Sequence, residues 1–285
     1  MNTAYWTAHF RQNQINRPEP DWSLPMKLNG KPLRLLRKSL QQFQLGDGGG
    51  PASLIGWDRE RMLGQSNEMR ELVDLWFKEE AEHSRLLGEA LKRFGVDPIE
   101  SHWSFSMFCG VRKWGGVGFE LYALLLTEIV SHVYYKLLRR HFPDDALRQM
   151  CQLIIRDEAG HIAFHRARLA AEGKRYGLFW SGWFRLRGLA AGTVLWLNHG
   201  AALRSEGATN GEFYRAIWRG MSAFVRGLRR DSVEVRSGSA RRDSGKSPGA
   251  RFTPERHRGK GNAVAHQSCR RLCVKSPCPK VRSLG

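Results

Sequence analysis

Apolar residues recur at three- and four-residue steps along most of the chain, the spacing that places side chains on one face of an α-helix. The pattern predicts four main helices and two later ones, over about residues 33–43, 67–94, 118–140, 144–172, 178–204 and 211–228. No segment alternates apolar and polar residues as a half-buried strand does. The sequence therefore predicts an all-α fold.

The same pattern divides the chain into four segments. Residues 1–31 are polar and hold three prolines, so we expect them to be poorly ordered. Residues 32–174 hold the four main helices, with a long crossover over about 95–115, and residues 175–228 hold two accessory helices. Residues 229–285 are rich in Ser, Gly, Arg and Pro, and they bury too little apolar surface to offset the entropy lost on ordering. This last segment is predicted to be a disordered basic tail.

Carboxylates and histidines stand on the apolar stripes of three predicted helices. Glu80 and His83 lie on the second helix, Glu158 and His161 repeat their spacing on the fourth, and Glu128 lies on the third. A three-residue step turns a helix by about 300°, so both side chains of each Glu-x-x-His pair project from one face. Buried charges are paired or bind metals, and mixed carboxylate and imidazole ligands suit iron or manganese. The pattern therefore indicates a metal site built from several helices.

Each Glu-x-x-His pair taken alone has a simpler explanation. It could be an ion pair within the core, or it could lie on a solvated face if the buried side of the helix is placed wrongly. So short a motif also arises by chance, and two copies are only mildly unusual in a chain of this length. The metal interpretation therefore depends on the combination of both pairs with the third helix.

This combination resembles the ligand set of the ferritin-like di-iron and di-manganese carboxylate proteins. The order of helices, with the crossover between the second and third, is similar, and the segment FQLGDGG at 43–49 looks like the first helix of rubrerythrin-type members. The rubredoxin-like module of those members is missing, because the chain has no pair of C-x-x-C motifs. Over about residues 33–172 the resemblance implies a ferritin-like four-helix bundle that holds two iron ions, with manganese as the alternative. It also implies reaction with dioxygen or peroxide, with the metal held by Glu80, His83, Glu128, Glu158 and His161.

The first-helix ligand of the family corresponds to Asp47, which is one methylene shorter than the usual Glu. Three glycines and Pro51 follow it, and in a helix interior each Gly costs about 1 kcal/mol and a Pro about 3 kcal/mol relative to Ala. We therefore expect the first helix to kink or break at this position. Because a ligand is needed at this position, we expect the metal to bind weakly or asymmetrically, or not at all.

Further side chains are placed around the ligands or away from them. His165 and Tyr135 are placed as hydrogen-bonding partners of the ligands, with ordinary packing as the alternative for both. Four further acidic residues are assigned to solvated helix faces: Glu79, Glu82, Glu120 and Asp157. For Asp157, pairing with a neighbouring arginine is the alternative.

Charge and hydropathy indicate which partners and which cellular location the protein can have. Of the net charge of +19, residues 229–285 carry +11, since they hold 15 Lys and Arg against 4 Asp and Glu. Such a tail predicts weak, salt-sensitive nucleic-acid binding, with a functionless extension and a shifted reading frame as alternatives. A mean hydropathy of −0.47 and no apolar stretch long enough to span a bilayer predict a soluble, cytoplasmic chain without a transmembrane segment. An interfacial membrane helix is the alternative for residues 178–204, where Arg185 and Arg187 flank an apolar face.

The leading interpretation is a non-haem di-iron or di-manganese oxidoreductase that acts on an unidentified small molecule. The alternative is a metal-free helical scaffold or binding protein with a degenerate metal site, which binds nucleic acid through its tail. Either interpretation is compatible with a homodimer.

Overall fold

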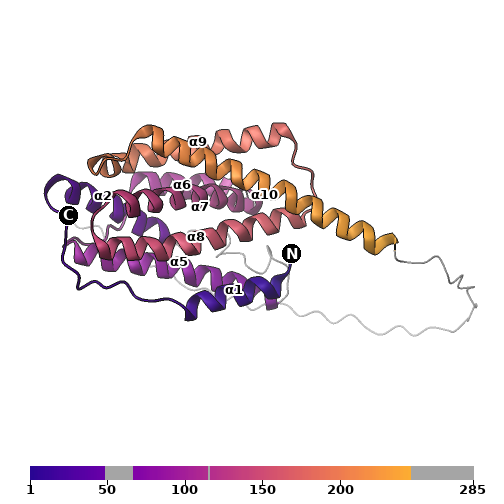
Figure 1. The fold of residues 1–285 in the computed structure, drawn as a ribbon, viewed down its shortest axis with the longest axis horizontal. Coiled ribbons are helices and arrows are strands. Elements are labelled where there is room, and N and C mark those ends of the chain that lie inside the picture. Colours follow the sequence, from indigo (N-terminus) through magenta and orange to yellow (C-terminus); the bar gives the residue numbers. More distant parts are fainter. Residues whose placement is uncertain (49–66, 115, 245–285) are drawn as a thin grey trace, which may run out of the picture. The chain divides into compact units, whose positions relative to one another are not determined.

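The computed structural model describes residues 1–48, 67–114 and 116–244 (Figure 1). Within these ranges every regular element is an α-helix, so the predicted all-α class is confirmed. The helices are α1 (Thr3–Ile15), α2 (Gly30–Gly48), α5 (Asn67–Arg93), α6 (Trp103–Trp114), α7 (Gly116–His141), α8 (Asp145–Ala171), α9 (Leu178–Ser205) and α10 (Asn210–Ser244). None of them is both long and apolar enough to cross a membrane.

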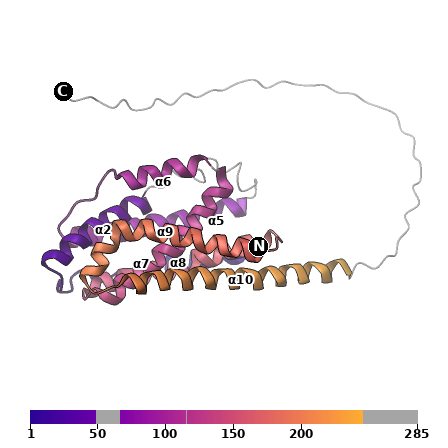
Figure 2. The same cartoon turned by 90° about the horizontal axis from the view of Figure 1, so that it is seen from above.

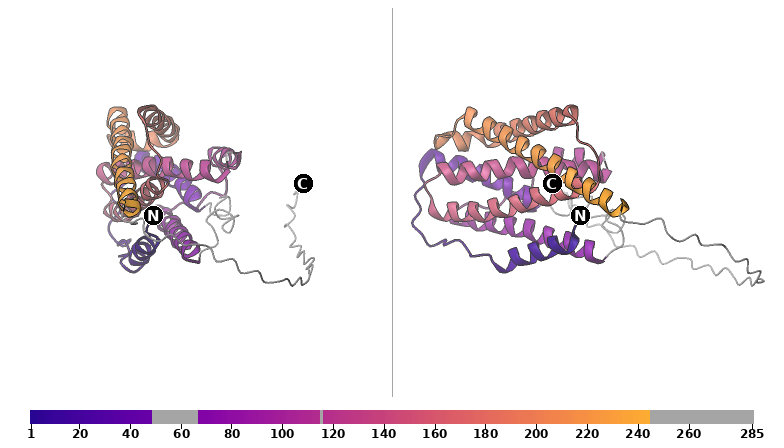
Figure 3. Two further views of the ribbon diagram at one scale, coloured as in Figure 1. Left: turned by 90° about the vertical axis from the view of Figure 1, so that its right-hand side faces the viewer. Right: turned by 45° about the vertical axis from the view of Figure 1, so that its right-hand side comes forward.

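The two helices with Glu-x-x-His motifs, α5 and α8, contact each other. α2 packs along α5, and α7 packs along α8, while α9 covers α2 and α7 and α10 covers α7 and α8 (Figures 2 and 3). The end of α5 is tied to the start of α8 by Arg93, whose guanidinium lies 3.0 Å from the buried carboxylate of Asp144. Asp144 also caps α8 by accepting a hydrogen bond from the backbone N–H of Leu147. These contacts fix the relative position of the two motif-bearing helices.

The N-terminal segment contains a helix, which contradicts the expectation that residues 1–31 are poorly ordered. Trp6 and Phe10 of α1 are buried in an apolar cluster with residues of α5, α7 and α8. The ring of His9 on α1 lies against Gly160 of α8, where a Cβ would lie 2.8 Å from Nε2 of His9. The composition of the segment is polar, but its few large apolar residues have a partner surface that only the fold supplies.

α2 continues to Gly48, so Asp47 lies in its last turn and the helix does not break before that residue. The predicted effect of Pro51 lies outside the described residues. The sequence predicted a long connection over about residues 95–115, and within it residues Trp103–Trp114 form α6.

The predicted boundary at residue 228 falls inside α10, which runs on to Ser244. Beyond the boundary, Ser232 is buried, and Asp231 lies 2.7 Å from Nε of Arg166 on α8. Arg229 donates a hydrogen bond to Oγ of Ser181 on α9. The helix continues because these polar contacts with α8 and α9 replace the apolar stripe that ends at residue 228. The rest of the predicted tail, residues 245–285, lies outside the described residues.

Candidate metal centre

Three of the predicted ligands, one each from α5, α7 and α8, meet in the core. Glu80, Glu128 and His161 each offer one donor atom, and these atoms all lie within 4.8 Å of one another. Nδ1 of His161 is 3.1 Å from Oε1 of Glu80 and 3.3 Å from Oε2 of Glu128. Donor atoms of this kind and separation can share one metal ion.

The other predicted ligands surround this trio. Nδ1 of His83 lies 3.7 Å from Oε2 of Glu80, and the rings of His83 and His161 have their centroids 5.8 Å apart. Glu158 accepts a hydrogen bond of 3.1 Å from Oγ of Ser131, and its charge interacts with those of Glu80, Glu128 and His161. Four helices therefore contribute carboxylate or imidazole groups to one cluster once Asp47 of α2 is included.

Asp47 reaches the cluster from the last turn of α2. Its Oδ2 accepts a hydrogen bond of 3.3 Å from the hydroxyl of Tyr135, the residue that we placed beside the ligands. Burial, with the nearby charge of Glu80 as the next cause, raises the pKa of Asp47 to about 7. The shorter side chain is thus close enough to Glu80 and Glu128 for their charges to act on it.

Each ligand histidine is held by a carboxylate from the opposite motif helix. Nε2 of His83 lies 3.1 Å from Oδ2 of Asp157 on α8, and Nε2 of His161 lies 3.0 Å from Oε2 of Glu79 on α5. Asp157 and Glu79 each directly precede the glutamate of their own motif. A carboxylate at Nε2 favours a proton on that nitrogen, so Nδ1 is the nitrogen that faces the cluster, where a metal ion could replace its proton. The two halves of the site therefore have the same design.

The assignment of Glu79, Asp157 and Glu120 to solvated faces is wrong, because all three side chains are buried. Glu82 is partly exposed and pairs with Arg85 at 2.7 Å. A signal was present in the sequence, since an acidic residue precedes the glutamate in both motifs. It was missed because α5 and α8 are covered by neighbours on more than one side, so their buried faces are wider than a single apolar stripe.

Asp157 is the centre of a buried ionic network that closes the cluster on the α1 side. Besides His83, it contacts the guanidinium of Arg17 and lies 3.0 Å from that of Arg156. Its side chain is fully buried. The sequence suggested an arginine partner for Asp157, and the structure supplies two.

In the cluster, several buried carboxylates lie close together around two imidazoles, and this shifts the pKa values of both kinds of group. Burial raises the pKa of Glu158 well above its usual range, and the charge of Glu128 adds to this effect. Burial alone would lower the pKa of His161, but Glu128 and Glu80 outweigh it and hold that pKa well above its usual range. Burial likewise opposes the charged form of His83, yet Asp157 and Glu80 raise its pKa to about 9. Carboxylates thus crowd together where the sequence predicts metal, and the raised pKa values mean that protons offset part of their mutual repulsion in the metal-free protein.

The donor set of Glu80, Glu128 and His161 can hold a metal ion. Nδ1 of His83 and Oε2 of Glu158 are buried and have no hydrogen-bond partner in the described part of the chain. A buried polar atom without a partner costs about 1–3 kcal/mol, so such atoms need an explanation. Bound metal would provide a partner for atoms of this kind, and it would also offset the charge of the carboxylates.

His165, the other residue that we placed beside the ligands, makes no hydrogen bond in the described part of the chain. Its buried ring stands edge-on to that of Trp76, with centroids 5.3 Å apart. Trp76 itself donates a hydrogen bond of 3.1 Å from Nε1 to Glu80. His165 therefore reaches the cluster through the packing of Trp76 and not through a polar contact.

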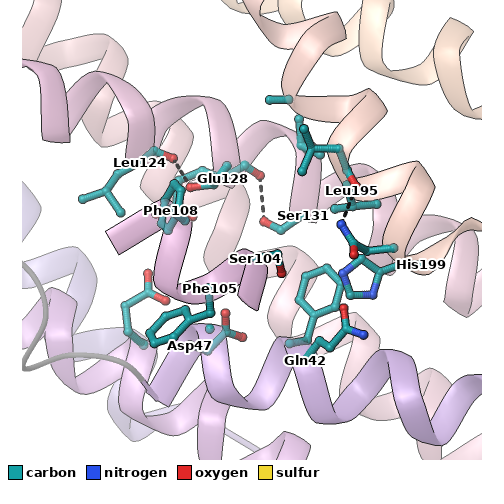
Figure 4. A pocket seen from close by; sticks show the side chains of 18 of the residues that line it. Gln42, Asp47, Ser104, Phe105, Phe108, Leu124, Glu128, Ser131, Leu195 and His199 are labelled. Carbon is teal, nitrogen blue, oxygen red and sulfur yellow. Dashed lines mark hydrogen bonds between the residues drawn. The ribbon is translucent and has the colours of Figure 1, made fainter. Parts of the chain in front are cut away.

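A pocket of about 300 Å³ opens beside the cluster. Figure 4 looks into it, with Gln42 and Asp47 of α2, Glu128 and Ser131 of α7, and His199 of α9 around the cavity. Aromatic and aliphatic side chains make up much of the remaining wall: Phe43, Trp76, Phe77, Phe105, Phe108, Leu124, Val130, Ala191, Val194 and Leu195. The pocket thus gives a small molecule access to the carboxylates through a mainly apolar wall.

His199 is a pocket residue that the sequence did not single out. Its Nδ1 lies 2.9 Å from Oγ of Ser39, which in turn lies 2.6 Å from the hydroxyl of Tyr134. Burial, with the charge of His102 as the second cause, lowers the pKa of His199 to about 3. His199 therefore stays neutral in the folded protein at neutral and mildly acidic pH.

The low pKa of His199 predicts a loss of stability in acid. Between pH 6.5 and about 3 the unfolded chain binds a proton at this histidine and the folded chain does not, so stability falls as the pH falls through that window. In urea unfolding at several pH values, His199→Asn should lose less stability than the parent, by about 1.4 kcal/mol per pH unit below 6.5. Leu197→Asn, at an exposed position of the same helix, should follow the parent. Parallel curves for parent and His199→Asn would contradict this account.

Comparison with models of known families, with curated proteins and with solved structures found no match to this chain.

Proposed function

We propose that the chain holds two iron or manganese ions in this cluster and acts as a non-haem oxidoreductase of the ferritin-like di-iron type, reacting with dioxygen or peroxide. The observation that carries the proposal is the paired design of the site. Two Glu-x-x-His motifs face each other, and each histidine is oriented by a buried carboxylate of the opposite helix. Glu128 and Asp47 add a carboxylate from each of two further helices.

The paired carboxylates argue against accidental clustering. A scaffold needs neither Glu79 nor Asp157 at the far side of a histidine, and burying each of them is costly unless it is paired. In metal sites, such partners set the tautomer of the ligand histidine and increase its basicity. The arrangement of α2, α5, α7 and α8, with the long connection after α5, also agrees with the helix order of the proposed family.

In the proposed chemistry, the protein orients the ligand side chains, excludes water from the cluster and gives a small molecule access to it. Bound metal ions would supply the electrons for reduction of dioxygen or peroxide. Asp157 and Glu79 hold the imidazoles, while the buried rings of Phe10 and Phe164 keep water from one side of the cluster. The pocket on the other side admits a small molecule as far as the carboxylates.

A metal-free scaffold is the second candidate, and one observation favours it. His161 already lies within 3.3 Å of carboxylate oxygens of Glu79, Glu80 and Glu128, so it forms ion pairs without any metal. The proposed nucleic-acid binding through the basic tail depends on residues outside the described ranges.

Metal analysis separates the two candidates. Protein purified without chelators and loaded anaerobically with Fe(II) should retain about two ions per chain after desalting, measured by plasma mass spectrometry. His161→Gln should lose most of this metal, because it removes a ligand nitrogen from the centre of the cluster. Glu89→Gln is the control on α5, since Glu89 pairs with the exposed Lys92 outside the cluster. Absence of retained iron and manganese in the parent would rule out the proposal.

A further inference from the structure

The outer face of α9 is apolar along almost its whole length. Phe179 is 87% exposed and Leu197 is 78% exposed, although both are large hydrophobic residues. Other exposed residues of the same helix join them at three- and four-residue steps: Trp183, Leu186, Ala190 and Val194. We call these six residues the α9 stripe. Exposed apolar surface that is continuous in this way marks a contact with another molecule or with a membrane.

The charges around the α9 stripe are all positive. α9 contains no Asp or Glu, and its only charged residues are Arg185, Arg187 and Arg204. The guanidinium of Arg187 lies over the ring of Trp183 at 5.1 Å, and that of Arg185 lies over the half-exposed ring of Trp218 at 5.5 Å. Long cationic side chains that lie on aromatic rings beside an apolar face are typical of helices at a lipid–water interface.

α10 extends this positive border. It packs against α9, and it exposes three arginines at positions near Trp218: Arg215, Arg219 and Arg226. The hydroxyl of Tyr214 on α10 donates a hydrogen bond of 3.2 Å to Oγ1 of Thr193 on α9, which shows that the outer faces of the two helices adjoin. The surface beside the apolar stripe is therefore suited to a negatively charged partner.

We propose that the α9 stripe binds the surface of a lipid bilayer that contains anionic lipids, with α9 lying in the plane of the interface. The helix is not apolar enough to cross a bilayer, so it would insert only its outer face. A second copy of the chain fits less well. Pairing two copies through α9 would bring Arg185 and Arg187 of one copy close to those of the other, with no acidic residue on either helix to compensate.

Docking on this face would bring the membrane close to the pocket. Val194 belongs to the α9 stripe and also lines the pocket beside the carboxylate cluster. The proposal does not depend on the proposed metal chemistry, because the stripe is exposed whether or not the cluster binds metal.

Vesicle binding by the full chain tests the proposal. Sedimentation with vesicles of equal parts phosphatidylcholine and phosphatidylglycerol should pull down the parent, and phosphatidylcholine vesicles should do so less well. The measurements are repeated in 0.5 M NaCl, which screens attraction by the basic tail but leaves apolar insertion. The variant F179S/L186S/L197S should partition at least tenfold more weakly at both salt concentrations. Because all three positions are exposed, it should keep the helicity of the parent.

The control variant Y5S/I15S removes two exposed apolar residues from α1 and should bind like the parent. Equal binding by the parent and F179S/L186S/L197S would overturn the proposal, because the attachment would then lie elsewhere in the chain. Light scattering after gel filtration measures the oligomeric state and so tests the alternative that a second copy binds the stripe. A parent dimer that dissociates in F179S/L186S/L197S, together with no vesicle binding, would assign the stripe to a second copy and overturn the proposal.

Discussion

Asp157→Ala should lower the free energy of unfolding of the metal-free protein by about 3–5 kcal/mol, whereas Glu158→Ala should change it by less than about 1 kcal/mol or raise it. Asp157 is buried against Arg17, Arg156 and His83, so its removal deprives the largely buried Arg17 and His83 of their nearest counter-charge. Burial, with the charge of Glu128 as the second cause, disfavours the ionised form of Glu158, so its removal takes away a group that is unfavourably placed in the metal-free core. The two positions are neighbours, and both substitutions delete a buried carboxylate.

Urea unfolding in the presence of a chelator measures both effects. Thermal unfolding with added Fe(II) under anaerobic conditions then gives the second half of the comparison. Metal should raise the melting temperature of the parent by mass action, and Glu158→Ala should remove most of this rise. If Glu158→Ala destabilises the metal-free protein as strongly as Asp157→Ala, and metal has no effect on the parent, the cluster is an ordinary network of core ion pairs.

Phe10→Ala should lower the free energy of unfolding by about 3–5 kcal/mol, the usual cost of removing a fully buried phenyl ring. Its ring is fully buried, with its centroid 5.8 Å from that of His161 and 6.0 Å from that of Phe164. Tyr5→Ala is the matched control on the same helix. Because Tyr5 is 59% exposed, this substitution should change stability by less than about 0.5 kcal/mol.

The same urea experiment distinguishes a docked α1 from a loose one. A cost below about 1 kcal/mol for Phe10→Ala would show that α1 contributes little to the core and that residues 1–31 behave as the polar composition predicted. A large cost would show that α1 covers one side of the cluster in solution. In that case, Phe10→Ala should also weaken metal retention, because water would reach His161.

The helical class and most helix limits could be predicted from the sequence, because both depend on local periodicity. α5 begins at the predicted residue 67, and α8 begins one residue after the predicted start at 144, which is its N-cap. The candidate ligands could also be named, because Glu80, His83, Glu128, Glu158 and His161 stand on apolar stripes. A polar residue in such a position must be paired in the core, whatever the partner is.

Other features could not be read from periodicity, because they depend on contacts between distant segments. Glu79 and Asp157 look solvated in a single helix, and they are buried because α5 and α8 pack against each other and against further helices. α1 folds onto the core because Trp6 and Phe10 find a surface made by three other helices. In the same way, α10 passes the end of its apolar stripe because Asp231 pairs with α8.

The sequence by itself determined that this chain is helical and that carboxylates and histidines interrupt its buried faces, since side-chain spacing along a helix follows from backbone geometry. Only the tertiary structure decided which of these groups meet. In the folded chain, Asp157 of one motif helix contacts His83 of the other, and Glu79 contacts His161 in the same way. The fold also leaves the α9 stripe exposed. The physical reason is that the energy of a buried charge or an apolar face depends on its neighbours, and those neighbours come from other parts of the chain.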